Sequence, residues 1–91
     1  MGGFSYEFDS LKDASNQAKH GVSLALVADF EWETAQLRED VRVAYAERRF
    51  QALGYVQGRL HVVVFCFRGQ AVRVISMRKA NSREVNGHAQ P

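Results

Sequence analysis

Two apolar runs near the C-terminus dominate the pattern of hydrophobic and polar positions along the chain. They cover residues 60–67 and 71–77, are rich in Val, Ile and Phe, and are separated by a short segment containing Gly69. These residue types fit a pleated, half-buried surface, and glycine supplies the positive φ angle of a tight hairpin. The pattern predicts an antiparallel β-hairpin at the centre of a sheet.

Further strands are predicted on both sides of this hairpin. Alternation of Phe4, Tyr6 and Phe8 with polar residues indicates a short N-terminal strand. A third alternating segment covers residues 48–56, and Gln57-Gly58 makes a turn into the hairpin. We therefore expect a meander of three strands with the N-terminal strand added at an edge. A short strand is also possible at 34–37, and the charged segment 38–42 is predicted to be a loop.

Two helices are expected between the first strand and the meander. The first begins at Ser10, which resembles a capping residue, and stops at Gly21, which suits a left-handed C-cap. Ser23 caps the second helix, which extends to about Trp32. Spacing predicts that both bury an apolar stripe, and the stripe residues are Leu11, Ala14, Ala18, Leu24, Val27 and Ala28. A last short helix is predicted over residues 80–86, followed by a fraying tail that includes His88.

Composition fits this outline. Ninety-one residues with 46% apolar and 24% charged side chains suit one soluble domain. The predicted fold class is α+β, with two N-terminal helices packed on a mostly antiparallel sheet, in a single domain over residues 1–91. One cysteine, Cys66, excludes an internal disulfide, and no apolar run approaches membrane-spanning length. A cytoplasmic location is expected.

Charge is unevenly distributed along the chain. Residues 1–47 hold nine of the ten acidic residues, whereas residues 48–91 hold eight of the twelve Lys and Arg. No acidic residue lies between Arg59 and Arg83. A sheet that carries so many cations presents a positive surface, and polyanions such as RNA are its natural partners.

Two segments are the most specific parts of a pattern that covers residues 4 to 84, namely KHGVS at 19–23 and RVISMRKA at 73–80. With this pattern the chain resembles the BrnT family of toxins from bacterial type II toxin–antitoxin systems. Other matching positions are Phe8-Asp9, Asp40-x-Arg42, Glu47-x-Arg49-Phe50 and Glu84. Three features depart from the family pattern. The family commonly carries a Trp near position 8, where this chain has Phe, and it often has Asp-Pro where this chain has Trp32-Glu33. His88 lies roughly where many members have a Tyr.

The resemblance implies a compact RelE-type toxin architecture and a ribonuclease that inhibits translation and growth by cutting RNA. It also implies a BrnA-type antitoxin as partner, and a toxin–antitoxin complex of this kind can contain the toxin as a dimer. The alternative is a catalytically weak or inactive binding module that keeps only the antitoxin or nucleic-acid interface. A sequence-tolerant RNA or DNA binder of another kind is a second alternative.

RNA cleavage without a metal needs a base for the 2′-OH, cations for the charge developing on phosphorus, and an acid for the leaving oxygen. No ligand spacing for a metal is present, and no cofactor is expected. Our catalytic candidates are His20, Glu47, Arg73 and Arg78, and our RNA- and phosphate-binding candidates are Lys19, Arg49 and Lys79.

Each candidate also has a structural interpretation. His20 suits the C-terminal end of a helix dipole, Glu47 suits a salt bridge, and charges near a strand end suit solvent. Arg73 is the most informative, because a mid-strand arginine needs an acidic partner such as Glu47 or an anionic ligand. Arg73 and Arg78 differ in strand parity, so both face one phosphate only if a bulge or the strand end intervenes.

Overall fold

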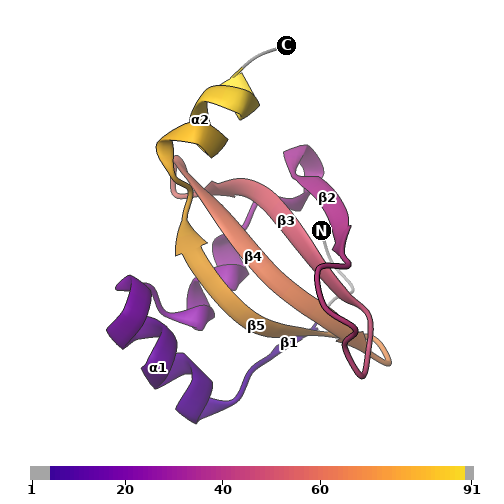
Figure 1. Cartoon of the computed structure of the whole chain (residues 1–91). Coiled ribbons are helices and arrows are strands. Elements are labelled where there is room, and N and C mark those ends of the chain that lie inside the picture. Colours follow the sequence, from indigo (N-terminus) through magenta and orange to yellow (C-terminus); the bar gives the residue numbers. More distant parts are fainter. Residues whose placement is uncertain (1–4, 90–91) are drawn as a thin grey trace.

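A five-stranded mixed sheet forms the centre of the computed structural model, which describes residues 5–89 (Figure 1). The strands follow the order β1-β5-β4-β3-β2; β1 is parallel to β5, and all other neighbours are antiparallel. Their bounds are Ser5–Glu7 (β1), Gln36–Asp40 (β2), Arg49–Val56 (β3), Arg59–Arg68 (β4) and Ala71–Lys79 (β5). The α+β class, the central hairpin, the meander and the N-terminal edge strand are confirmed, although Phe4 lies outside the described residues.

Both hairpin turns use positive φ angles, as the sequence predicts. Gln57 and Gly58 have φ angles of 51° and 78° between β3 and β4, and Gly69 has a φ of 59° between β4 and β5. A two-residue turn with positive φ matches the right-handed twist of the strands it joins. Local sequence therefore sets the register of the three longest strands.

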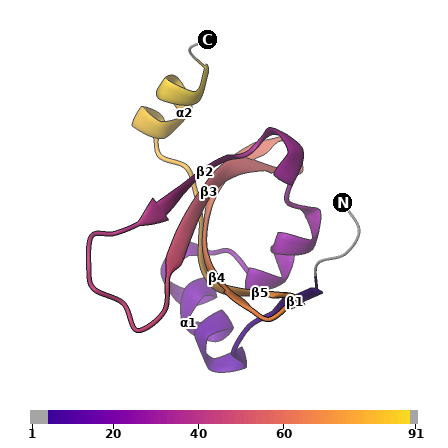
Figure 2. The same ribbon diagram turned by 90° about the vertical axis from the view of Figure 1, so that its right-hand side faces the viewer.

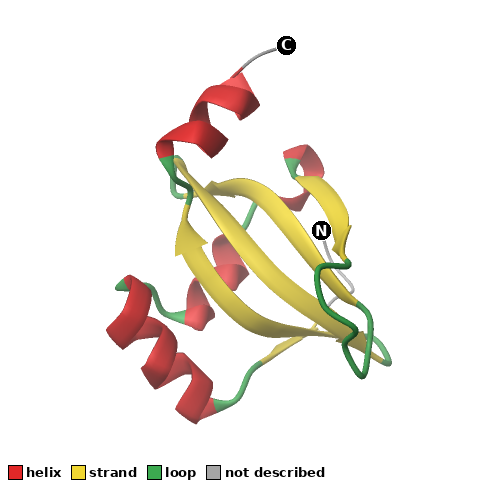
Figure 3. Ribbon diagram, in the orientation of Figure 1, coloured by secondary structure: helices red, strands yellow, loops and turns green. Residues whose placement is uncertain are grey.

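One α-helix, not two, precedes the meander. Figure 3 colours this helix and the 3₁₀-helices that follow it alike, in red. Helix α1 covers Ser10–His20, but the predicted second helix is a 3₁₀-helix, η1, over Leu24–Asp29, and a further 3₁₀ turn, η2, covers Trp32–Thr34. Ser23 does cap η1, accepting from the Ala25 amide. An α-helix cannot continue to Trp32 because Phe30 is extended and forms a β-bridge with Val56.

Helix α1 also differs from the prediction in its cap and its buried face. Asp9, not Ser10, is the N-cap, and its carboxylate accepts from the amides of Leu11 and Lys12. Gly21 ends the helix with a φ of 71°, as expected. The predicted stripe is wrong, because Leu11 is 79% exposed and the only buried residue of α1 is Asn16.

The hydrophobic core lies between η1 and one face of the sheet, which curls around it (Figure 2). Leu24 and Val27 of η1 are buried there, whereas the predicted Ala28 is exposed. Trp32 joins the core edge-on to Phe65 at 5.2 Å between ring centroids. The buried sheet residues of this cluster are Ala52, Val56, Val63, Phe65, Val72, Val74 and Met77.

Two segments that the sequence predicts as loop or tail are regular. Residues 36–40 form the edge strand β2, whose backbone pairs in register with β3. The short strand predicted at 34–37 is therefore confirmed for residues 36–37, and the loop predicted at 38–42 is wrong for residues 38–40. Helix α2 covers Ser82–Ala89 and includes His88, so the predicted fraying tail is wrong for residues 87–89, while residues 90–91 lie outside the described part. Among the described residues, no helix is long and apolar enough to cross a membrane.

Candidate functional site

The face of the sheet opposite the core, which we call the outer face, carries most of the candidate residues. Side chains of directly paired residues share a face. Asp40 of β2 pairs with Arg49 of β3, and the β3–β4 register places Arg49 beside Cys66. Cys66 in turn pairs with Arg73 of β5, and Arg73 pairs with Glu7 of β1, so these residues form one row across the sheet. Since these positions alternate with core residues, the row lies on the outer face.

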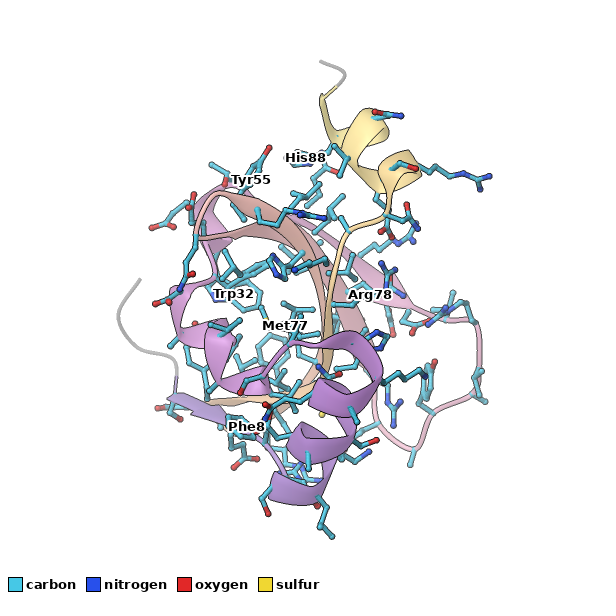
Figure 4. All side chains as sticks on the ribbon, turned by 90° about the vertical axis from the view of Figure 1, so that its left-hand side faces the viewer. Phe8, Trp32, Tyr55, Met77, Arg78 and His88 are labelled. Atoms are coloured by element: carbon cyan, nitrogen blue, oxygen red, sulfur yellow. The ribbon has the colours of Figure 1, made fainter. Side chains whose placement is uncertain are left out.

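A β-bulge in β5 brings Arg73 and Arg78 to this same face. Val74 pairs with Phe65 and Ser76 pairs with Val64, so Ile75 has no partner in the β4–β5 ladder. The bulge changes the alternation, so that Val74 and Met77 are both buried although they are three residues apart. Figure 4 shows Met77 and Arg78 on opposite sides of the β5 ribbon. Of the two routes considered from sequence, the bulge is the one present.

Each of these two arginines faces a carboxylate, but the two contacts differ in strength. Arg73 Nη1 lies 3.5 Å from Glu7 Oε1, at the outer limit of a hydrogen bond, and the Glu7 side chain is 42% exposed. Arg78 instead donates to both oxygens of Glu84 at 2.8 and 2.9 Å. The Arg78 guanidinium lowers the pKa of Glu84. Arg73 is thus held loosely, whereas Arg78 is held in a bidentate pair.

Glu47, Arg49 and Arg68 lie close to Cys66, and Arg73 pairs with Cys66 across the sheet, so we call these four charged residues the arginine cluster. The Glu47 carboxylate lies 3.6 Å from the Arg68 guanidinium. Cys66 is 1% exposed, and burial first, then the neighbouring Glu47 charge, raises the pKa of its thiol, while Arg68 and Arg49 act in the opposite direction. The Glu47 carboxylate and the Arg68 and Arg49 guanidinium groups therefore all lie close to Cys66.

Arg49 differs from Arg68 and Arg73, its neighbours in the arginine cluster, because it has no acidic partner among residues 5–89. Its Cζ lies 4.3 Å from the centroid of the Tyr45 ring, as a cation–π contact. Its Nε is shielded from solvent and has no hydrogen-bond partner in the described chain. No carboxylate neutralises the positive charge of this partly buried guanidinium, so it can attract an anionic ligand.

The remaining candidates lie apart from the arginine cluster. His20 is one helical turn beyond Asn16, which contacts Met77, and its imidazole makes no hydrogen bond or ion pair with residues 5–89. Lys19 is exposed on α1. Lys79 pairs with His61, so it faces away from Arg78. The structure therefore places Glu47, Arg49 and the backbone of Arg73 around Cys66, whereas the other candidates lie elsewhere.

Sequence reasoning missed a groove on the outer face, beneath α2. It has a volume of about 440 Å³, and its lining includes Arg38, Leu53, Val62, Glu84 and His88. The His88 ring packs edge-on against Tyr55 at 5.5 Å, so this residue belongs to a packed helix. No local signal marks this groove, because strands β2, β3 and β4 and helix α2 all contribute to it.

Asp40 and Tyr45 were also missed as components of the site. In the sequence, Asp40 stands out only as part of the Asp40-x-Arg42 match, and the charged run around it suggested a solvated loop. Asp40 is in fact buried, and Arg42 and Tyr45 both donate to its carboxylate. The Asp-x-Arg spacing was the only available signal. No group of three or more His, Cys, Asp or Glu among residues 5–89 is arranged to hold a metal ion.

Comparison with known proteins gives an independent line of evidence. A search of curated proteins finds no match to this chain. The family model described as "Ribonuclease toxin, BrnT, of type II toxin-antitoxin system" matches residues 8–84, which is most of the chain and includes every candidate residue named above. The chain therefore belongs to the BrnT family of ribonuclease toxins of type II toxin–antitoxin systems.

Proposed function

We propose that this protein is a metal-independent RNA endonuclease and that the arginine cluster is its cleavage site. The observation that carries the proposal is Arg73, a cation in the middle of the central hairpin whose 3.5 Å contact with Glu7 leaves it free to bind a stronger anion. A phosphodiester offers two oxygens to a guanidinium and makes shorter, charge-assisted hydrogen bonds. The family, ribonuclease toxins, supports RNA as the substrate.

The proposed reaction is a transesterification within the RNA. Glu47 accepts the proton of a 2′-OH, the 2′-oxygen attacks the adjacent phosphorus, and the bond from phosphorus to the 5′-oxygen breaks. Arg73 and Arg49 stabilise the negative charge that develops on the phosphoryl oxygens. His20, our sequence candidate for the acid, lies at the end of α1 apart from the arginine cluster, so in this proposal a water molecule returns a proton to the leaving 5′-oxygen. The products are a 2′,3′-cyclic phosphate and a 5′-hydroxyl.

Loss of RNA by this reaction would inhibit translation and growth in the cytoplasm, so the toxin requires neutralisation. A type II toxin has an antitoxin partner, and we propose that this partner is of the BrnA type. The groove beneath α2 and the arginine cluster both lie on the outer face. A partner that covers this face would block RNA, which agrees with neutralisation by direct binding.

A direct test is cleavage of bulk RNA by the purified protein in the presence of EDTA. We expect cleavage that leaves 2′,3′-cyclic phosphate ends, a loss of about 10²-fold or more for Arg73→Ala, and partial activity for Arg73→Lys. Arg59→Ala is the matched control, since Arg59 is exposed and its side chain has no partner in the described chain. Equal activity of Arg73→Ala and Arg59→Ala would contradict the proposed site.

The alternative of a non-catalytic binding module gains support from the Arg78–Glu84 pair. Two hydrogen bonds of 2.8 and 2.9 Å neutralise a cation that RNA would otherwise use. If the alternative is correct, RNA stays whole under all conditions while the antitoxin still binds. A steep salt dependence of RNA binding without cleavage would instead indicate a nucleic-acid binder.

A further inference from the structure

Asp40 fixes the loop that connects β2 to β3. Its side chain is 1% exposed and accepts from the Arg42 amide at 3.3 Å, from Arg42 Nε at 2.9 Å and from Arg42 Nη2 at 2.8 Å. The Tyr45 hydroxyl donates to the same carboxylate at 3.1 Å. Figure 2 shows this loop, residues 41–48, projecting from the sheet on the side away from η1 and η2. One buried carboxylate thus ties two points of an otherwise exposed loop to the sheet.

Tyr45 connects this anchor to the arginine cluster. Its hydroxyl is bonded to Asp40, and its ring lies against the Arg49 guanidinium at 4.3 Å. No other side-chain interaction fixes the Arg49 guanidinium within residues 5–89. The orientation of Arg49 therefore depends on the position of a ring that Asp40 holds in place.

We propose that Asp40 is a positioning residue that sets the orientation of Arg49 through Tyr45. The inference rests on the proposed RNA cleavage, since Arg49 matters only if it binds the phosphate there. Asp40 itself does not touch the substrate, because its carboxylate is buried and its hydrogen bonds are directed to Arg42 and Tyr45. A guanidinium that is already oriented loses less conformational entropy when it binds a phosphate.

Tyr45→Phe isolates this connection from a general effect on the loop. Phenylalanine keeps the ring against Arg49, and the Asp40–Arg42 hydrogen bonds are left intact. We expect kcat/KM for RNA cleavage to fall about tenfold, the effect of one lost hydrogen bond to a charged group. The thermal midpoint should change by less than about 4 °C. Tyr55→Phe is the matched control, because the Tyr55 hydroxyl has no partner among residues 5–89.

A double variant shows whether the effect passes through Arg49. In an Arg49→Ala background, Tyr45→Phe should have no further effect on kcat/KM, since interacting residues are not additive. An equal tenfold loss in both backgrounds would show that Tyr45 acts by another route. Asp40→Asn should resemble Tyr45→Phe in kinetics, with a greater loss of stability because Arg42 also loses a charged partner.

An NMR measurement tests the positioning separately from catalysis. The Arg49 Nε–H resonance is shifted by the Tyr45 ring current, and we expect it to move in Tyr45→Phe and Asp40→Asn but not in Tyr55→Phe. An unmoved resonance, together with full activity of Tyr45→Phe, would overturn the proposal. If wild-type protein cleaves no RNA but the resonance moves as expected, the proposed function fails while the positioning by Asp40 holds.

Discussion

The Asn16 side chain completes the free edge of β5 by bonding both backbone groups of Met77. Asn16 Nδ2 donates to the Met77 carbonyl at 2.8 Å, and the Met77 amide donates to Asn16 Oδ1 at 3.2 Å. The same Nδ2 donates to the Val22 carbonyl at 2.8 Å. Strand β1 pairs only with residues 71–73 of β5. A single amide from α1 therefore takes the place of a strand residue further along this edge.

Asn16→Ala should strongly destabilise the fold. The substitution leaves the Met77 amide and carbonyl and the Val22 carbonyl without partners in a buried region. We expect the free energy of unfolding to fall by about 2–4 kcal/mol in urea titrations. Gln17→Ala, which removes one exposed bond to Asp13, should cost less than about 0.5 kcal/mol. Similar values for the two variants would contradict the edge-closing role.

Gly54→Ala and Gly87→Ala should change stability in opposite directions. A Cβ at Gly54 would lie 2.7 Å from Phe30 Cζ and 3.1 Å from Ala35 Cβ. We expect a loss of about 1–3 kcal/mol from this overpacking. No atom lies within 4 Å of a Cβ at Gly87 in α2, so alanine there should add about 0.5–1 kcal/mol. Thermal unfolding of both variants checks the pair, and a stabilised Gly54→Ala would be inconsistent with the packing of Phe30.

Local signals predicted much of the fold. Turn residues at Gly58 and Gly69 and the apolar runs beside them identified the hairpins, because turn chemistry and alternation act over a few residues. Long-range contacts explain the failures. Residues 38–40, which were predicted as a loop, belong to β2 because they pair with β3. The 3₁₀-helix η1 ends before Phe30, because Phe30 is extended and bridges to Val56. No window of neighbouring residues contains those partners.

The candidate site was predictable by composition but not by geometry. Arginines on the central hairpin pointed to a basic face. Arg73 was expected to need either an acidic partner such as Glu47 or an anionic ligand, and the carboxylate nearest to it in the structure is that of Glu7. The bulge at Ile75 carries no sequence signal, yet it decides that Arg78 shares a face with Arg73. The sequence suggested that Asp40 is solvated, because Arg42, which donates to its carboxylate, follows two residues later in a charged run.

The contribution of Glu84 to stability should depend on pH. The hydrogen bond from Arg78 lowers the pKa of Glu84 below its ordinary value of 4.5. A lowered folded-state pKa stabilises the protein above the ordinary pKa, and this stabilisation is lost as the pH falls through the folded-state value. Wild type should therefore be more stable than Glu84→Gln at pH 7, and the difference should shrink progressively as the pH falls below the ordinary Glu pKa and through the lowered folded-state pKa. Thermal midpoints across this range measure it, and a difference that is constant with pH would exclude the ion pair as its cause.

Glu84→Gln also tests whether Arg78 belongs to the RNA-binding face. Glu84 accepts from the Asn81 amide at 2.9 Å, and Asn81 Oδ1 accepts from the Glu84 amide at 2.8 Å, so the pair forms a reciprocal N-terminal cap of α2. Glutamine preserves this cap but removes the charge that neutralises Arg78. If RNA contacts Arg78, the affinity for a non-cleavable 2′-O-methyl RNA should rise several-fold, and the salt dependence should steepen by about one phosphate contact.

Fluorescence anisotropy at several salt concentrations measures both quantities, and Arg78→Ala combined with Glu84→Gln is the control in which the gain should disappear. Unchanged affinity and slope in Glu84→Gln would restrict Arg78 to holding α2 against the sheet. RNA recognition would then depend on the arginine cluster alone. Arg73 pairs with Cys66 and Arg78 pairs with Val62, four residues along β4. At the rise of a β-strand this is roughly 13 Å between the two backbones, so an Arg78 that does bind RNA would extend the contact surface beyond the arginine cluster.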